Sequence, residues 1–219
     1  MIKLYGIPIS NNVAKVRYCL NYLNLDYELI ETSPLKGENQ TDEFKAINPT
    51  GKVPAIDLDG FTLFESNTIN RYLATVQNSP TYPTDARQRA LVDAWSDFIS
   101  IHVAHAMGRV GFNRLLAPVL GAEVDEKSIQ TGLDFLAKYF PVLEEQLSKN
   151  KHIAGDKITL ADIALLATLD QAELCQIDLS AYPNLTKWRN NLKAQAFYQK
   201  CYQDYTMFAQ ETMAAMSAS

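Results

Sequence analysis

The sequence predicts two domains, a small α/β domain followed by an all-helical domain. Strand-like and helix-like segments alternate over residues 1–76, whereas apolar residues after residue 85 recur at helical spacing. Residues 77–84, between these regions, are rich in Pro, Ser and Thr, as linkers often are. At 219 residues, the chain is long enough for each domain to bury a core. We therefore expect domains at about 1–76 and 85–219.

The first domain is expected to have the element order βαβ and then ββα. Ser10, Asn11 and Asn12 can cap its first helix, since short polar side chains accept hydrogen bonds from the first helical N–H groups. Asp59-Gly60 between two alternating apolar and polar segments is a strong signal for a hairpin. The expected elements are a strand at 2–6, a helix at about 13–23, a strand at 27–30, a polar loop at 34–40, one or two helical turns at 42–47, hairpin strands at 56–58 and 61–63, and a helix at about 65–76.

The second domain is predicted to begin with a helix capped by Thr84 or Asp85. Leu91, Trp95 and Phe98 would share one face of this helix. At the other end of the chain, the residues after about 212 are small and polar enough to fray.

A long helix further along carries a regular apolar stripe. Its members alternate at spacings of four and three residues: Ile129, Leu133, Leu136, Phe140, Leu143 and Leu147. Pro141 lies within the stripe at a cost of roughly 3 kcal/mol in a straight helix, so we expect a kink there. Gly108 and Gly111 each weaken the preceding helix by about 1 kcal/mol, which indicates a bend or a close contact. Thr159 and Asp162 have the spacing of a capping box, a strong helix start.

Composition excludes several classes of function. A net charge of −5 without a basic cluster argues against a nucleic-acid surface, and no apolar run approaches the ~18 residues of a membrane span. Cys19, Cys175 and Cys201 are an odd number without C-x-x-C spacing, which favours a reducing compartment, and the expected location is cytoplasmic. His102 and His105 lack a third ligand at suitable spacing, so no metal is expected.

One stretch has the features of a site for a short peptide. The extended Lys52-Val53-Pro54 segment offers backbone hydrogen bonds at a strand edge, and Glu65-Ser66 opens a helix nearby in the sequence. The helix N-terminus and the Ser66 hydroxyl favour a carboxylate, whereas Glu65 can pair with an ammonium group. Because these are the two ends of an α-amino acid, we predict a small peptide ligand with a free amino-acid head.

These residues resemble the cytosolic glutathione S-transferase family over nearly the whole chain. The matching motifs are Asn48-Pro49-x-Gly51-Lys52-Val53-Pro54, Glu65-Ser66-Asn67-x-Ile69-x-Arg71-Tyr72-Leu73, and Thr159-Leu160-Ala161-Asp162. The resemblance implies a thioredoxin-like first domain, an all-helical second domain, a cis bond before Pro54, and glutathione as co-substrate without a metal. Val53 would pair with its cysteinyl part, Glu65 and Ser66 with its γ-glutamyl end, and Lys52 would lie near its carboxylates.

The residue facing the glutathione sulfur decides the chemistry. Ser10 stands where the serine-using classes, such as phi and theta, keep their catalytic serine, although Ser10 could equally be only a helix cap. Asn11 is the alternative, since members resembling the bacterial nu class use Asn or Thr here and favour disulfide and peroxide substrates. Asn39-Gln40 replaces the basic pair usual in phi members, so a cationic grip on the glycyl carboxylate is lost, although Asn39 could still donate a hydrogen bond.

The resemblance also implies a homodimer and a pocket for a second substrate. Ile9, His105, Arg109 and Phe112 are the candidates for that pocket, with core packing as the other interpretation for the histidine. The favoured function is conjugation of the glutathione thiolate to apolar electrophiles, a detoxification chemistry, with possible peroxidase activity. The alternatives are a disulfide or peroxide reductase using Asn11, and a non-catalytic binding protein of the same fold.

Overall fold

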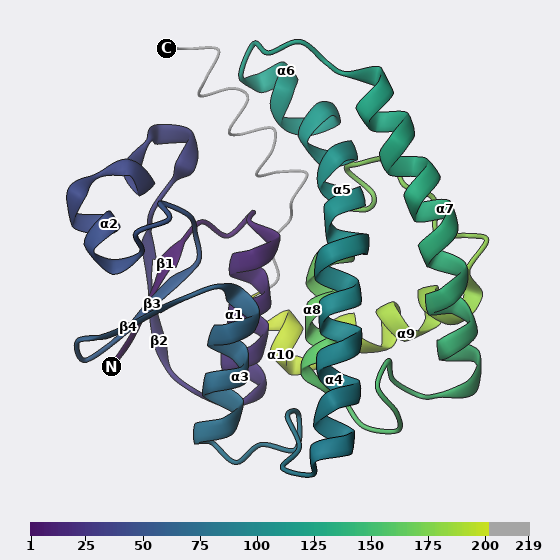
Figure 1. Cartoon of the computed structure of the whole chain (residues 1–219), viewed down its shortest axis with the longest axis horizontal. Coiled ribbons are helices and arrows are strands. Elements are labelled where there is room, and N and C mark those ends of the chain that lie inside the picture. The colour runs from purple at the N-terminus through teal and green to yellow at the C-terminus, as the bar shows by residue number, and fades with distance from the viewer. Residues whose placement is uncertain (202–219) are drawn as a thin grey trace.

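The N-terminal part of the chain forms a four-stranded mixed sheet in the computed structural model, which describes residues 1–201 (Figure 1). The strands are β1 (Ile2–Gly6), β2 (Tyr27–Glu31), β3 (Ala55–Leu58) and β4 (Phe61–Phe64), in the spatial order β2-β1-β3-β4. β1 runs parallel to β2 and antiparallel to β3, and β3 and β4 form the expected hairpin. Asp59 and Gly60 turn this hairpin with φ angles of 52° and 96°, the left-handed conformations that a tight turn of this kind requires.

Helices cover both faces of this sheet. They are α1 (Asn11–Tyr22), α2 (Asp42–Ile47) and α3 (Ser66–Val76). Leu4 of β1 packs with α1 and α3 in the core of this domain, whereas the next residue, Tyr5, points to the opposite face and contacts Phe44 of α2. The segment predicted as a polar loop is instead two short 3₁₀ turns, Pro34–Lys36 and Glu38–Gln40, because Gly37 joins them with φ 75°.

The helical domain follows as a long, broken helix and a bundle around α8. Its elements are α4 (Ala86–Phe98), the π-helical turn η3 (Ile99–Val103), α5 (Ala104–Gly111), the π-helical turn η4 (Phe112–Leu116), α6 (Ala117–Val119), α7 (Glu126–Lys149), α8 (Leu160–Leu169), α9 (Pro183–Lys193) and α10 (Ala196–Gln199). α8 is buried along its whole length, as befits the central helix of a bundle.

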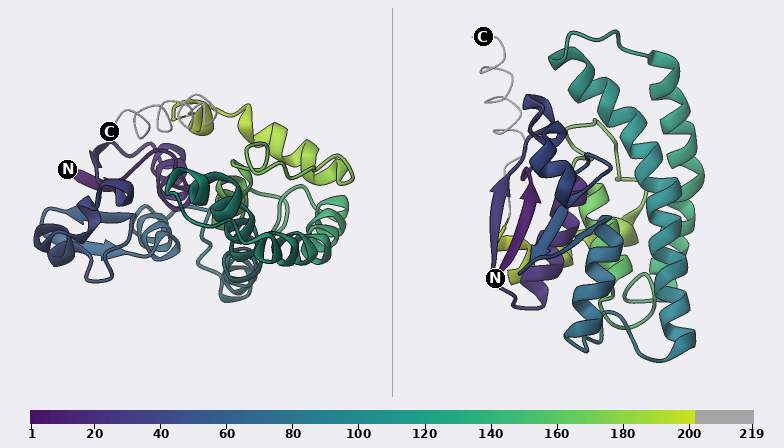
Figure 2. Two further views of the ribbon diagram at one scale, coloured as in Figure 1. Left: turned by 90° about the horizontal axis from the view of Figure 1, so that it is seen from above. Right: turned by 60° about the vertical axis from the view of Figure 1, so that its left-hand side comes forward.

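α1 joins the two domains, because it is buried on two sides. Val13, Val16 and Leu20 face the core of the first domain, whereas Tyr18 and Cys19 belong to the core of the helical domain. Figure 2 shows α1 and α3 between the sheet and the helical domain, in keeping with the packing of α1 against both α3 and α8. The start of α1 therefore lies where the two domains meet.

Several details of the helical domain refine the expectations from sequence. Asp85, rather than Thr84, caps α4 by accepting a hydrogen bond from the Gln88 N–H at 2.9 Å. Leu91 was expected on the packed face with Trp95 and Phe98, but it is 54% exposed. For Leu91 this expectation was wrong, because the fully buried residues of α4 are Val92 and Ser96, and Leu91 lies beside that face.

Two further expectations concern α7 and α8. α7 runs from 126 to 149 as one helix with Pro141 inside it. The capping box at the start of α8 is confirmed. The Thr159 side chain accepts from the Asp162 backbone N–H, and the Asp162 side chain accepts from the Thr159 backbone N–H. The fraying predicted after residue 212 lies outside the described residues. Within residues 1–201, no helix is both long enough and apolar enough to cross a membrane.

Candidate functional site

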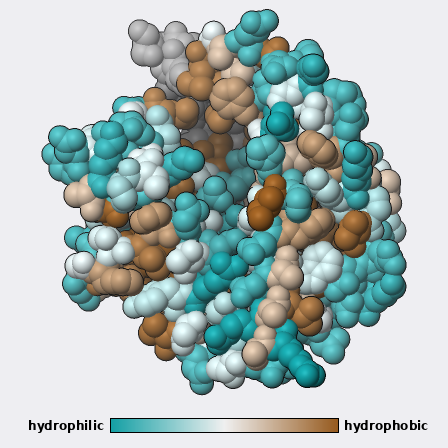
Figure 3. Space-filling view, viewed as in Figure 1, coloured by the Kyte–Doolittle hydropathy of each residue, from teal (hydrophilic) through white to brown (hydrophobic). Residues whose placement is uncertain are grey.

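An apolar cavity of about 460 Å³ lies between the two domains. On one side it is lined by the loop after β1, the start of α1 and the segment before β3: Ile7, Ile9, Ser10, Asn11, Lys15 and Val53. On the other side it is lined by α5, η4 and the turn after α8: Met107, Phe112, Arg114, Leu115, Leu116 and Gln171. Figure 3 shows the molecule hollowed between the domains, with apolar side chains at the edges of the hollow. A concave, mostly apolar site with a few polar groups is typical of small-molecule binding.

Ser10 stands at the N-terminus of α1 with its side chain at the cavity. Its backbone is extended, with φ −71° and ψ 119°, and its Oγ accepts a hydrogen bond from the Val13 N–H at 3.4 Å. Ser10 is thus a helix cap, as one interpretation of the sequence held. A hydroxyl that accepts a bond still has its own proton to donate, and the helix N-terminus beside it favours negative charge.

Asn11, the next residue, also lines the cavity. Its Oδ1 is buried and has no hydrogen-bond partner among the described residues. Because a buried polar atom without a partner is costly, such an atom at a cavity wall indicates a position where a ligand or water completes the hydrogen bonding. Both candidates for the residue facing the sulfur therefore lie together at the same wall.

Glu65 and Ser66 form the strained start of α3. Glu65 is the N-cap residue and has φ 67° and ψ 110°, a conformation rare for a residue with a side chain. Ser66 is buried, and its Oγ donates to Asn12 Oδ1 at 3.5 Å, next to the start of α1. Strain of this kind persists only where the surrounding structure imposes it, and it concentrates at functional sites.

Lys15, one turn into α1, is a cavity residue that sequence reasoning missed. It is only 3% exposed, and burial lowers its pKa to about 8, while the negative charge of Glu65 acts in the opposite direction. Its only sequence signal was its place among the apolar residues Ala14 and Val16 on a helix. Lys15 links the starts of α1 and α3 electrostatically.

The segment before β3 has the shape that the resemblance implied. The bond between Val53 and Pro54 is cis, and Val53 lines the cavity. Lys52 is exposed, and its carbonyl oxygen accepts a hydrogen bond from Asn48 Nδ2 at 2.6 Å. Asn39 is buried and donates from Nδ2 to the Gly51 carbonyl oxygen at 2.7 Å, so its amide holds this segment in place.

The chain matches known proteins over most of its length. The family model described as "Glutathione S-transferase, N-terminal domain" matches residues 1–75, and the one described as "Glutathione S-transferase, C-terminal domain" matches residues 99–196. Glutathione S-transferase 3 of Zea mays is 34% identical over 205 residues, which are 91% of this chain and 92% of that protein. The chain belongs to the glutathione S-transferase family.

Solved structures agree with this assignment. A delta-class glutathione transferase of Nilaparvata lugens superposes with a TM-score of 0.86 at 29% identity, covering 99% of this chain and 100% of that one. Glutathione transferase F2 of Populus trichocarpa superposes with a TM-score of 0.83 at 26% identity, covering 92% and 97%. The protein is therefore a glutathione transferase, with the thioredoxin-like and all-helical domains of that family.

Not all residues expected at the second-substrate pocket of this transferase line its cavity. Ile9 and Phe112 do. His105 is exposed and Arg109 donates from Nη1 to Ser128 Oγ on α7 at 3.3 Å, and neither lines the cavity. The residue of this helix that brings a positive charge to the cavity is Arg114, on η4, which lies on the same face as Met107 and Gly111.

Gln171 is a further lining residue that the sequence did not indicate. It follows α8 and donates from Nε2 to the Ile9 carbonyl oxygen at 2.7 Å, across 162 positions of sequence. This bond fastens the loop that carries Ser10 to the helical domain. No local pattern in the sequence could have indicated a contact over such a distance.

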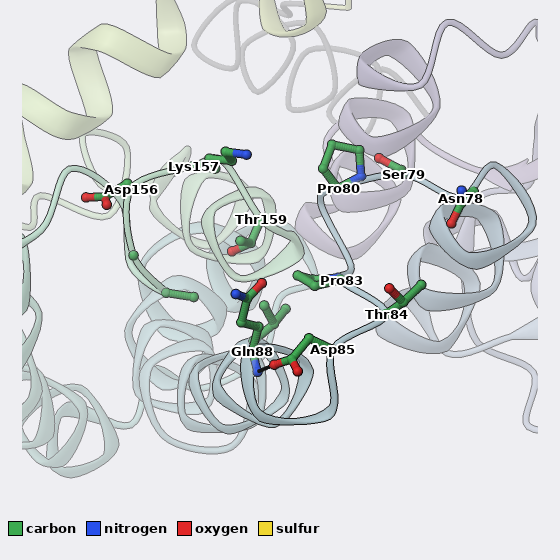
Figure 4. A pocket seen from close by; sticks show the side chains of 13 residues that line it. Asn78, Ser79, Pro80, Pro83, Thr84, Asp85, Gln88, Asp156, Lys157 and Thr159 are labelled. Carbon is green, nitrogen blue, oxygen red and sulfur yellow. Dashed lines mark hydrogen bonds between the residues drawn. The ribbon is translucent and has the colours of Figure 1, made fainter.

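A second cavity of this transferase, of about 530 Å³, lies elsewhere and differs in character (Figure 4). It is lined by the linker after α3, the start of α4 and the loop before α8, including Asn78, Asp85, Gln88 and Lys157. None of the residues predicted for glutathione or for the second substrate lies in its wall. The apolar cavity at the start of α1 is therefore the candidate active site.

Proposed function

We propose that this transferase activates the sulfur of glutathione as a thiolate beside Ser10 and adds it to an electrophilic carbon of an apolar small molecule. The observation that carries the proposal is the position of the Ser10 side chain, at a helix N-terminus and at the wall of an apolar cavity between the domains. Orientation of the two reactants and electrostatic stabilisation of the sulfur are then the protein's contribution to the rate.

Glutathione is held, in this proposal, along the first domain beside the cavity, whose wall includes Val53 but not Lys52, Glu65 or Ser66. Glu65 pairs with its ammonium group, and Ser66 with the first N–H groups of α3 holds the γ-glutamyl carboxylate. The backbone of Val53 pairs with the cysteinyl part. Lys52, which is exposed, supplies positive charge for the glycyl carboxylate. Asn39 supports this grip indirectly, through its bond to the Gly51 carbonyl oxygen.

A hydroxyl and a helix N-terminus are sufficient for the thiolate. A free thiol with a pKa of about 8.5 is only a few per cent thiolate at neutral pH, and lowering the pKa by two units requires about 2.7 kcal/mol. A hydrogen bond to a charged acceptor supplies roughly 1.5–3 kcal/mol, and the N-terminus of α1 supplies up to ~1 kcal/mol. No general base is needed at this sulfur.

Conjugation by the Ser10→Ala and Asn11→Ala variants tests which residue serves the sulfur. We expect Ser10→Ala to lower kcat/KM by about 10²-fold, the magnitude for loss of one donor to a developing anion, while the variant is still retained on glutathione-agarose. Asn11→Ala should change it by less than Ser10→Ala. A larger loss in Asn11→Ala than in Ser10→Ala would contradict the serine-type assignment.

Glutathione-dependent reduction of disulfides or peroxides is the second candidate. It is favoured by the unpartnered, buried Oδ1 of Asn11 at the cavity wall. Peroxidase and disulfide-reductase assays with glutathione and the same two variants separate the candidates. Reduction that exceeds conjugation in rate and depends on Asn11 would support this second function.

We also infer a cytoplasmic homodimer formed through α3 and α4. These helices carry the exposed apolar side chains of Val76 and Leu91. Arg71 of α3 forms ion pairs with Asp93 and Asp97 of α4, at 2.7 Å and 3.2 Å, which makes one continuous surface of the two helices. Three buried cysteines without a disulfide support a reducing compartment.

A further inference from the structure

The wall of the apolar cavity carries an excess of positive charge. Two of its lining residues, Lys15 and Arg114, are basic, and none of the lining residues within 1–201 is Asp or Glu. This contrasts with the whole chain, which has 25 acidic and 20 basic residues. The charge of Lys15 faces Glu65 on the glutathione side, so Arg114 is the cation on the second-substrate side that lacks a carboxylate.

The guanidinium of Arg114 is fixed in place by backbone groups. Its Nη1 donates to the carbonyl oxygens of Cys175 at 2.5 Å and Gln176 at 3.2 Å, in the turn that follows α8. In the described part of the chain, its hydrogen bonds use Nη1 alone, so the donors on Nε and Nη2 remain for another acceptor. Because these two groups carry parallel N–H bonds, they match the two oxygens of a carboxylate.

The surroundings strengthen such an interaction. Leu115 and Leu116 adjoin Arg114 on η4 and line the same cavity with Phe112. An ion pair beside apolar side chains that shield part of it from water is stronger than one fully in water. The cavity thus combines apolar walls with one guanidinium group whose Nη1 is held by backbone carbonyl oxygens.

We propose that the second substrate of this transferase is an apolar electrophile that carries a carboxylate, and that Arg114 holds this carboxylate. The inference rests on the proposed function and names the substrate class of the same site. With an enone as electrophile, the thiolate sulfur forms a bond to the β-carbon, the carbon–carbon π bond breaks, and the resulting enolate takes a proton from water. No group leaves, and no other oxidant or reductant takes part.

A matched pair of enones tests the proposal on the wild-type protein. The probes are para-carboxybenzalacetone and para-carbamoylbenzalacetone, which share shape and electrophile and differ in charge. At saturating glutathione, we expect the carboxylate to have about 10-fold higher kcat/KM, the ratio that one charge-assisted hydrogen-bonded pair provides. Equal values for the two probes, or a preference for the carboxamide, would overturn the proposal.

Three variants locate the preference. Arg114→Met, which keeps the length of the side chain, should bring the ratio of the two probes to about one, whereas Arg114→Lys should keep part of it. Arg87→Met, at an exposed position of α4, is the matched control and should keep the whole preference. A preference that persisted in folded Arg114→Met would assign it to Lys15 and overturn the role of Arg114. If Arg114→Met does not fold, the ratio of the two probes in the wild type and its partial loss in Arg114→Lys still test the role of Arg114.

Two controls distinguish failure of the proposed function from failure of the carboxylate proposal. Unsubstituted benzalacetone and glutathione-agarose report conjugation and glutathione binding without any carboxylate. If the protein conjugates no benzalacetone, calorimetry with phenylbutyrate and phenylbutanamide, in the presence of S-methylglutathione, tests the carboxylate site alone. Tighter binding of phenylbutyrate that is lost in Arg114→Met would sustain the inference, and equal binding of the two would end it.

Discussion

At the scale of single residues, the site contains three residues whose burial or backbone conformation is energetically unfavourable. Lys15 is a buried cation, Asn11 has a buried oxygen without a partner in the described chain, and Glu65 has a φ angle of 67°. Each of these features costs free energy in the folded protein. All three occur where α1 and α3 begin. This concentration is typical of a site that a ligand completes.

The buried Lys15 makes stability depend on pH in a definite direction. Burial lowers its pKa from 10.5 to about 8, so between these values the unfolded chain binds more protons than the folded one. The free energy of unfolding should therefore rise with pH over that window and stay level, for this group, below pH 8.

The measurement for Lys15 is urea denaturation of the wild type and of Lys15→Met at several pH values across the window. The difference between the two proteins isolates Lys15 from the other groups that titrate there. As the pH rises, we expect the free energy of unfolding of the wild type to increase relative to that of Lys15→Met. A difference that stayed constant, or that fell, would contradict a lowered pKa.

At the scale of elements, two π turns divide the long helix of the second domain. Neither η3 nor η4 was predicted, because a hydrogen bond from residue i to residue i+5 has no distinct sequence pattern. The cavity wall takes Met107, Gly111 and Arg114 from one face of this helix, at spacings of three to four residues, whereas the expected Arg109 lies off that face. Gly108 and Gly111 indicated a bend or a close contact, and Gly111 makes a close contact, since an added Cβ would lie 3.3 Å from Cys175 Sγ, whereas one at Gly108 would meet nothing within 4 Å.

Gly132, at the contact of α7 with α5, and Gly108, on an open side of α5, provide a matched pair of variants. A Cβ at Gly132 would lie 2.8 Å from the Ala106 carbonyl oxygen and 2.8 Å from Val110 Cγ2, whereas a Cβ at Gly108 would have nothing within 4 Å. Gly132→Ala should therefore lower the free energy of unfolding by about 1–3 kcal/mol through overpacking. Gly108→Ala should raise it by about 1 kcal/mol through helix propensity. Thermal and urea denaturation measure both, and equal effects would contradict this packing.

The sequence predicted the elements where local chemistry decides them. The Asp59-Gly60 turn, the cap of α1 and the box at Thr159 and Asp162 are all set by a few adjacent residues, and all are present. Ser10 and Asn11 could be selected for the same reason, since a helix start is a local feature.

Residues that reach the cavity from distant segments could not be predicted in this way. Gln171 contacts Ile9 across 162 positions, and which face of the long helix lines the cavity, with Arg114 on it, depends on how the two domains pack. Lys15 was overlooked because a lysine is usually exposed, and its burial arises from tertiary packing, which includes a hydrogen bond from Asn70 of α3 to its carbonyl oxygen.

At the scale of the whole molecule, α1 and α8 unite the two domains. Tyr18 of α1 donates a hydrogen bond to Asp170, at the end of α8, and Tyr198 of α10 donates to the same carboxylate at 3.1 Å. Arg17 and Tyr27 join α1 to β2 on the other side, at 3.3 Å. Because the cavity lies between the domains, its shape depends on this junction.

The proposed dimer is tested by mass in solution. Light scattering should give about twice the 24.6 kDa of one chain. Leu91→Asp, which places a charge on the proposed contact surface of α4, should shift the protein toward the monomer. Val142→Asp is the control, since Val142 is 43% exposed on α7 and lies outside that surface. A wild-type monomer, or equal effects of the two variants, would contradict the proposed interface.

The most direct measurement is the ultraviolet absorbance of the glutathione thiolate in the complex as a function of pH, in the wild type and in Ser10→Ala. The account predicts that the bound thiol has a pKa about two units below the ~8.5 of a free thiol in the wild type, and that the value returns toward 8.5 in Ser10→Ala. A bound thiol with an unshifted pKa, or a shift that survives in Ser10→Ala, would contradict activation of the sulfur by Ser10.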